Sequence, residues 1–104
     1  KPLYILTNRG CYSATNEFVS TMKYAPRVTV VGDRTGGGSG FPFSSELPNG
    51  WSVRFSTSPT FNAEKEHIEF GVEPDVRLDM KYSDLNQMKD TYIEYARKEI
   101  SNEN

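Results

Sequence analysis

Residues 3–32, LYILTNRGCYSATNEFVSTMKYAPRVTVVG, decide the fold class of this chain. The apolar run Leu3–Thr7 predicts a short buried strand, and Asn8-Arg9-Gly10 forms a typical turn after it. Residues 13–25 have the spacing of a helix, and Arg27–Gly32 predicts a second strand. A strand, a helix and a strand joined by short links form a βαβ unit, in which the two strands are parallel neighbours. The segment therefore predicts an α/β fold.

The expected helix over residues 13–25 has an apolar face. Ala14, Phe18 and Met22 recur at intervals of four, which places them on one side of a helix. Pro26 is a suitable end, because proline cannot continue the helical hydrogen bonding. We expect this face to cover the sheet.

A glycine-rich loop and a hairpin follow the second strand. Residues 33–40 predict a flexible loop, and residues 41–60 predict a β-hairpin with a two-residue turn at Asn49-Gly50. Trp51, Val53 and Phe55 alternate with polar residues, which predicts a half-buried strand.

The last third of the chain predicts two short extended pieces and an amphipathic helix. His67–Phe70 is the first piece, and Val76–Leu78 is expected to be an edge strand. From Ser83 onward the pattern is helical, with Ser83 as the cap. The apolar stripe of this helix consists of Leu85, Met88, Tyr92, Tyr95 and Ile100.

Composition excludes several classes of protein. The chain has 104 residues, a net charge of −2 and 36% hydrophobic residues, which suits one small folded domain or part of a larger one. No segment is long and apolar enough for a transmembrane helix, and the scattered basic residues argue against nucleic-acid binding. The single cysteine, Cys11, excludes an internal disulfide and a cysteine-based zinc site. No motif indicates a metal or a cofactor.

The first residues suggest part of a longer chain. The sequence begins with Lys1 and not with Met, and the first expected strand starts at residue 3. We therefore expect residues 1–104 to be a fragment or subdomain.

Ser13 is the first candidate for chemistry. It follows a strand and a glycine-containing turn and opens a helix, so the free N–H groups of the helix N-terminus lie beside it. The N–H of Ala14 is the natural donor to the oxyanion of an acyl-transfer intermediate. Two other interpretations stay open: Ser13 caps the helix, or Cys11 is the nucleophile, although Cys11 also suits a small buried thiol.

The glycine run 36–40 has two interpretations. A phosphate-binding loop would need Lys-Ser or Lys-Thr next, whereas Phe41-Pro42-Phe43 follows here, so nucleotide binding is disfavoured. The run is either a backbone that lies close to a bound chain near the serine, or a mobile linker.

Glu69 is the third candidate. It stands in a short apolar segment, so it is either buried and paired or exposed on a hairpin. His67 is two residues away, on the same face of an extended strand, so a constellation of Ser13, His67 and Glu69 is conceivable.

Lys23 does not suit a Ser-Lys pair with Ser13. It is ten residues from Ser13 on one helix, about 15 Å away, and its side chain cannot reach Ser13.

Four blocks of the sequence resemble the C-terminal processing (tail-specific) peptidases, family S41. They are LTNRGCYSATNEF (6–18), RVTVVGDRTGGGSG (27–40), LPNGWSVR (47–54) and IEFGVEPDV (68–76). Each block is weak alone, but their order and spacing are specific. The resemblance covers the chain to about residue 98 and implies the C-terminal part of a catalytic domain with a layered crotonase/ClpP-like α/β fold.

The resemblance implies roles for single residues. Ser13 matches the nucleophile, and the lysine of the Ser-Lys branch falls on Gly38, so the chain resembles the Ser-His branch related to the tricorn core peptidase. In that branch a histidine from earlier in the chain is the base, so His67 does not match it, and a glutamate assists through a second serine. Glu69 matches the glutamate best, with Glu73 as the alternative.

The implied activity is peptide hydrolysis through an acyl-enzyme on Ser13. Ala14 supplies one oxyanion donor, and the loop of Gly36, Gly37 and Gly38 borders the substrate cleft. Asn16 stands where many relatives have Glu. The base and a second oxyanion donor lie outside the chain, so we expect the fragment alone to be inactive.

The expected partners are a peptide or unfolded protein substrate and the N-terminal remainder of the same protein. Relatives with these motifs are often exported, which favours the cell envelope or periplasm. The alternative function is a non-catalytic binding module on the same fold, like the interphotoreceptor retinoid-binding proteins, or a degenerate peptidase kept for interactions. An intact Ser13 favours the peptidase, because a carrier does not need a nucleophile.

Overall fold

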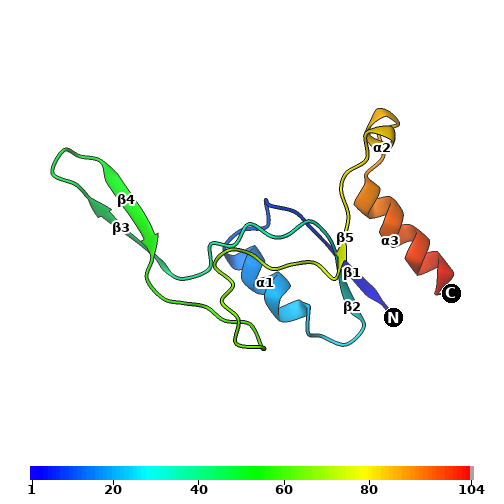
Figure 1. Cartoon of the computed structure of the whole chain (residues 1–104), viewed down its shortest axis with the longest axis horizontal. Helices are drawn as coiled ribbons and strands as arrows, with labels where there is room; N and C mark the ends of the chain where they lie inside the picture. The colour runs from blue at the N-terminus through cyan, green and yellow to red at the C-terminus, as the bar shows by residue number, and fades with distance from the viewer. Residues whose placement is uncertain (104) are drawn as a thin grey trace.

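The computed structural model describes residues 1–103, which form a mixed α/β structure with a projecting hairpin (Figure 1). In chain order the elements are β1 (Leu3–Thr7), α1 (Ala14–Met22), β2 (Val28–Gly32), β3 (Pro42–Glu46), β4 (Ser52–Ser56), β5 (Val76–Arg77), α2 (Tyr82–Asn86) and α3 (Thr91–Asn102). None of the helices in this part of the chain has the length and apolarity needed to cross a membrane.

The predicted βαβ unit is confirmed. β1 and β2 pair in parallel, from Leu3 opposite Val28 to Thr7 opposite Gly32. β5 adds to the other side of β2, also in parallel, so the sheet order is β1-β2-β5 and β5 is the expected edge strand. The carboxyl ends of β1 and β2 therefore lie together, and the chain leaves them toward Ser13 and the glycine loop.

The core lies between the sheet and α1. Val19 on α1 packs with Val30 on β2, Ile68 and Val72, and all four side chains are buried. Figure 1 shows α3 on the opposite side of the sheet from α1, and α3 contacts β1 and β2 there. Branched aliphatic side chains suit this position, because they pack well on a pleated surface.

The buried face of α1 differs from the expected one. The helix spans Ala14–Met22 and buries Asn16, Val19 and Ser20, whereas Phe18 is 54% exposed. The apolar spacing alone was misleading, because the polar Asn16 has hydrogen-bond partners in the interior and the small Ser20 is buried on the same face. An apolar side chain at position 18 is left for solvent or for a further partner.

The predicted hairpin is present, but its strands are not half-buried. β3 and β4 pair antiparallel with Phe43 opposite Phe55, and every residue of both strands is exposed. The hairpin projects from the body of the chain (Figure 1), and Ser56 at the end of β4 connects it to the body through a hydrogen bond to Glu69. The turn also differs: Leu47 pairs with Trp51 across three residues, 48–50, and Gly50 has a φ of 83°.

Two expectations for the last third of the chain are wrong. Residues 67–70 do not form a strand; a single bridge joins His67 to Phe61, and a turn closes from Ile68 to Gly71. The C-terminal helix is broken into α2 and α3 at Met88, because its φ of 57° cannot belong to a right-handed helix. The Met88 side chain is 96% exposed and is not part of an apolar stripe.

Asp90, not Ser83, caps the longer C-terminal helix. The Asp90 carboxylate accepts hydrogen bonds from the N–H groups of Tyr92 and Ile93 at the start of α3. Aspartate suits this place, since it satisfies two otherwise unpaired donors and meets the positive end of the helix dipole. The expected apolar stripe therefore applies only to α3.

Candidate active site

Ser13 has an unusual backbone conformation at the junction between β1 and α1. Its φ is 58° and its ψ is −120°, outside the regions that L-residues normally occupy. Such strain costs on the order of 1–3 kcal/mol and persists only where the surrounding structure fixes it. Ser13 is therefore held in place by its neighbours and not by local preference.

The glycine loop fixes the Ser13 turn. The Ser13 N–H donates to the Gly37 carbonyl at 2.7 Å, and the Gly36 N–H donates to the Cys11 carbonyl at 2.8 Å. Gly37 has a φ of 79°, and a side chain there would collide with the Glu69 carbonyl. Glycine is thus needed at position 37 for both its conformation and its close approach. The loop is closely packed and hydrogen-bonded, so of the two interpretations of the glycine run it does not fit the mobile linker.

The reactive groups of Ser13 and Ala14 are free. Within residues 1–103 the Ser13 hydroxyl makes no capping hydrogen bond, so the capping role is wrong. The Ala14 N–H, at the first position of α1, has no acceptor within the same residues. An unused N–H donor at a helix N-terminus is the kind of group that stabilises an oxyanion, and here it lies next to a serine hydroxyl that makes no capping bond.

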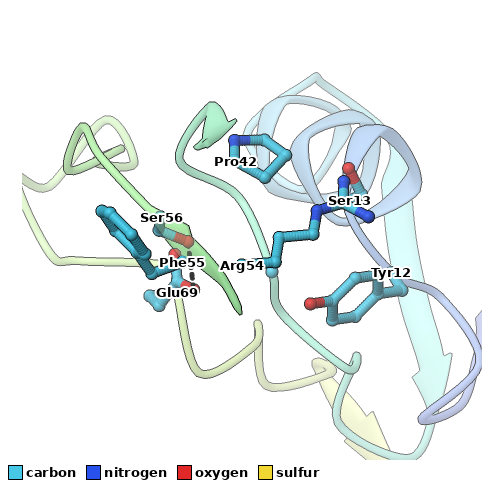
Figure 2. Close-up of a pocket in the computed structure, with 8 residues that line it drawn as sticks. Tyr12, Ser13, Pro42, Arg54, Phe55, Ser56 and Glu69 are labelled. Atoms are coloured by element: carbon cyan, nitrogen blue, oxygen red, sulfur yellow. Dashed lines mark hydrogen bonds between the residues drawn. The ribbon is translucent and has the colours of Figure 1, made fainter. Parts of the chain in front are cut away.

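Ser13 opens into a pocket of about 410 Å³ between the Ser13 turn and the hairpin (Figure 2). The pocket is lined by Tyr12, Ser13, Gly38, Pro42, Arg54, Phe55, Ser56 and Glu69. A smaller hollow also borders Ser13 and is lined in addition by Ala14, Glu17, Gly40, Phe41 and Pro42. The two hollows share Ser13 and Pro42, so both open beside the start of α1.

Glu69 lies in the Ser13 pocket, paired with a serine. Its Oε1 accepts a hydrogen bond from Ser56 Oγ at 2.8 Å, shown dashed in Figure 2. Its Oε2 is buried without a partner among the described residues. Glu73, the alternative glutamate, instead pairs with Arg34 and Arg77 and does not line this pocket.

His67 and Cys11 do not join Ser13. The His67 ring packs against Phe61 and Phe70, with centroids 5.5 and 6.4 Å apart, and it does not line the Ser13 pocket. Cys11 does not line it either, and its backbone pairs with Gly36. The geometry therefore does not assemble a triad of Ser13, His67 and Glu69.

Of the three glycines expected at the cleft, only Gly38 lines the pocket. Gly36 and Gly37 lie behind the Ser13 turn and support it. A side chain at position 38 would run into the ring of Tyr12, and Gly38 has a φ of 75°. The Tyr12 ring thus occupies the position that the Cβ atom of a lysine at position 38 would need.

Sequence reasoning missed a buried polar network behind the site. Asn16 Nδ2 donates to Ser39 Oγ at 2.9 Å and to the Ile68 carbonyl at 3.0 Å, and Asn16 Oδ1 accepts from Thr35 Oγ1. Thr35 Oγ1 also accepts from the Val72 N–H. The network joins α1, the glycine loop and the segment that carries Glu69. The spacing of the sequence could have indicated this network, because Asn16 is three residues before Val19 and therefore lies on the same, buried face of α1.

Asp33 is the centre of a surface charge cluster at the end of β2. It pairs with Arg9 at 3.2 Å and with Arg77 at 2.9 Å. The hydrogen bond from the Arg34 N–H, followed by those two guanidinium groups, lowers the pKa of the Asp33 carboxyl. The cluster thus connects the carboxyl ends of β1, β2 and β5 through ion pairs.

Comparison with known proteins gives the family. The model described as Peptidase family S41 matches residues 1–78. The chain belongs to peptidase family S41. The resemblance drawn from the four sequence blocks is thereby confirmed, and the structure has the α/β fold that the resemblance implies.

Related proteins agree with this assignment. An inferred peptidase from Parabacteroides merdae matches 94% of this chain with 56% identity and a TM-score of 0.89. Mature CPAF in complex with lactacystin matches 94% of the chain with 28% identity and a TM-score of 0.78. A Chlamydia muridarum protein is 30% identical over 102 residues, or 94% of the chain.

This S41 chain spans only part of the length of these relatives. It spans 31% of the Parabacteroides protein, 19% of CPAF and 17% of the Chlamydia protein. The activity of a whole S41 protein therefore does not follow from this segment alone.

Proposed function

We propose that this chain carries the nucleophile of a serine peptidase and that Ser13 forms an acyl-enzyme with the substrate. The observation that supports this most is the Ser13 backbone, a non-glycine residue at a φ of 58° beside a pocket. Strained backbone of this kind gathers at active sites, and a serine nucleophile on a sharp strand-to-helix turn is a recurring arrangement.

The proposed reaction has two steps. Ser13 Oγ attacks the carbonyl carbon of the scissile peptide bond while a base removes the hydroxyl proton. The negative oxygen of the tetrahedral intermediate accepts a hydrogen bond from the Ala14 N–H. The C–N bond then breaks, the base returns the proton to the leaving amine, and water hydrolyses the ester on Ser13 to release the acid.

The base is a histidine outside residues 1–104. His67 is the single histidine of the chain and does not line the Ser13 pocket. The small share of each relative that this chain spans is consistent with further catalytic residues elsewhere in a longer protein. We therefore propose that the chain is the C-terminal part of a catalytic domain and is inactive by itself.

Glu69 is proposed to orient that histidine and to stabilise its charged form. Its carboxylate lies in the Ser13 pocket, and Ser56 holds one of its oxygens. The other oxygen is buried and unpaired within the described residues, so it is available to a donor from outside them.

The alternative of an apolar-ligand carrier fits the pocket less well. Arg54, Ser56 and Glu69 give the lining charged and polar groups, and burying these against an apolar ligand would be costly. A peptide, with its own donors, acceptors and charges, suits such a lining better.

The test is peptide hydrolysis by the complete protein and its Ser13→Ala variant. We expect Ser13→Ala to lower kcat by roughly 1,000-fold or more, as loss of a nucleophile does. Ser83→Ala, at an exposed serine on α2, is the matched control and should be as active as the wild type. Wild-type hydrolysis by Ser13→Ala would refute the proposal and favour a binding module or a degenerate peptidase.

A further inference from the structure

Arg54 is a positive charge without a partner in the Ser13 pocket. Its side chain forms no ion pair or hydrogen bond within residues 1–103, although it lines the pocket. The arginines that do pair with carboxylates are Arg9, Arg34, Arg77 and Arg97. Arg27 is also unpaired within this part of the chain, but it lines none of the pockets described here.

The hairpin directs Arg54 toward the nucleophile. Arg54 and Ser56 are two residues apart on β4, so their side chains leave the same face of the hairpin. Figure 2 shows Arg54 extended across the pocket with its guanidinium on the Ser13 side, while Ser56 and Glu69 lie on the other side. Among the residues that the structure describes, Glu69 and Arg54 form no ion pair, so the pocket residues 12–69 do not neutralise the Arg54 charge.

A guanidinium in this place selects for a carboxylate. It keeps its charge at any physiological pH and presents two parallel N–H donors that match the two oxygens of a carboxylate. A peptide supplies a carboxylate only as an Asp or Glu side chain or as its free C-terminus. The negative Glu69 repels such a group from the far side of the pocket and leaves the Arg54 side for it.

We infer that Arg54 is a specificity residue that binds a carboxylate of the peptide substrate close to the scissile bond. The inference rests on the proposed peptidase function of Ser13. It adds a substrate class to that function: peptides that are acidic beside the cleavage site, or that are cut close to a free C-terminus.

The experiment compares matched peptides with the complete protein. One series replaces each Glu near the cleaved bond by Gln or Lys, and a second series compares the C-terminal acid with the C-terminal amide. We expect wild-type kcat/KM to be roughly 10-fold higher or more for the carboxylate member of one series, as a charge-assisted hydrogen bond gives. The series that shows the preference identifies the source of the carboxylate.

Two variants connect the preference to Arg54. Arg54→Gln should abolish the preference, so that the ratio of kcat/KM between the carboxylate peptide and its neutral partner falls to about one, because the amide carries no charge to pair with the carboxylate. Arg54→Glu should reverse the preference, so that peptides with Lys near the cleaved bond have a higher kcat/KM than peptides with Glu there. Arg27→Gln, which removes one unpaired arginine away from the pocket, should leave the preference unchanged.

Binding to the Ser13→Ala protein provides a measurement that needs no turnover. The same peptides should bind more tightly as carboxylates, and Arg54→Gln in this background should remove the difference.

The outcomes separate the two proposals. If the wild type cleaves no peptide but this binding difference is found, the proposed catalytic function is wrong and the Arg54 site stands. If Arg54→Gln keeps the wild-type preference in hydrolysis and in binding, the inference is wrong while the peptidase function is unaffected. A shift of the pH–rate profile in Arg54→Gln without any change in preference would also overturn it, since Arg54 would then act on Glu69.

Discussion

At the scale of single residues, Ser13 combines strain with exposure. Its φ of 58° is unfavourable for any residue that has a Cβ, and two backbone hydrogen bonds between residues 11–13 and 36–37 hold it there. A residue that only capped α1 would accept a hydrogen bond at its hydroxyl oxygen from a backbone N–H of the first helical turn, and it would have an ordinary extended backbone. The conformation therefore serves the presentation of the hydroxyl more than the stability of the helix.

We expect Ser13→Gly and Ser13→Ala to differ in stability although both lack the hydroxyl. Glycine relieves the positive φ, and this gain exceeds its larger conformational entropy in the unfolded chain. Ser13→Gly should be more stable than Ser13→Ala by about 1 kcal/mol. Denaturant unfolding of the complete protein measures the difference, and equal stabilities would show that position 13 is not strained.

The charge cluster around Asp33 predicts a pH dependence of stability. Because the pKa of Asp33 is lowered in the folded protein, its contribution is present above the unfolded pKa and is lost as pH falls through the folded pKa. We expect the wild type to lose more stability than Asp33→Asn between about pH 5 and pH 2. Thermal unfolding across this range checks it, with Asp79→Asn, at an exposed position, as the control. Identical pH profiles for wild type and Asp33→Asn would contradict the assignment.

At the scale of elements, α1 is attached by polar contacts as much as by apolar ones. Val19 packs into the core, but Asn16 is fully buried and bonds to the glycine loop and to the segment before Glu69. Ser39 Oγ in turn lies 3.4 Å from the Ser13 carbonyl. The start of the helix, the loop and the glutamate segment thus keep one arrangement relative to each other.

Removing the Asn16 side chain should loosen this arrangement. Asn16→Ala removes the acceptor of the Thr35 hydroxyl and the donor to Ser39 Oγ, both in the interior, and we expect this to cost about 2–4 kcal/mol. Thr15→Ala, at the exposed neighbour, should change stability by less than about 0.5 kcal/mol. Chemical unfolding of both variants gives the comparison. A loss below about 1 kcal/mol in Asn16→Ala would show that water replaces the network.

The cap of α3 gives a second prediction at this scale. Asp90→Ala removes the acceptor of the Tyr92 and Ile93 N–H groups and should cost about 1 kcal/mol, whereas Asp90→Asn should retain most of it. The midpoint of thermal unfolding measures the order of the three proteins. If Asp90→Ala and Asp90→Asn unfold together, the cap does not stabilise α3.

At the scale of the whole molecule, the chain consists of a packed α/β body and a hairpin that leaves it. The body buries Val30 and Val31 completely, while Trp51 at the hairpin end is 71% exposed and Phe41 at its base is 80% exposed. The site lies at the junction, because the Ser13 turn belongs to the body and Arg54, Ser56 and Phe55 belong to the hairpin. The orientation of the hairpin therefore decides the shape of the pocket.

This distribution predicts how apolar substitutions act on stability. In the chain of residues 1–104, Trp51→Ser should change the free energy of unfolding by less than about 0.5 kcal/mol, because the side chain is already in solvent. Val30→Ala should cost about 2 kcal/mol through the cavity that it leaves beside Val19. Urea unfolding compares the two, and a larger loss in Trp51→Ser would show that the hairpin folds back onto the body.

The sequence by itself determined the βαβ unit, the edge strand, the hairpin and the family. These depend on local periodicity, turn residues and the order of short motifs, all of which can be seen within segments of about a dozen residues. The tertiary structure alone decided the Ser13 backbone, the buried Asn16, the break at Met88, the exposure of the hairpin and the place of Arg54 in the pocket. These depend on contacts between distant segments, such as the bond from Asn16 to Ile68 across 52 positions, which no local pattern encodes.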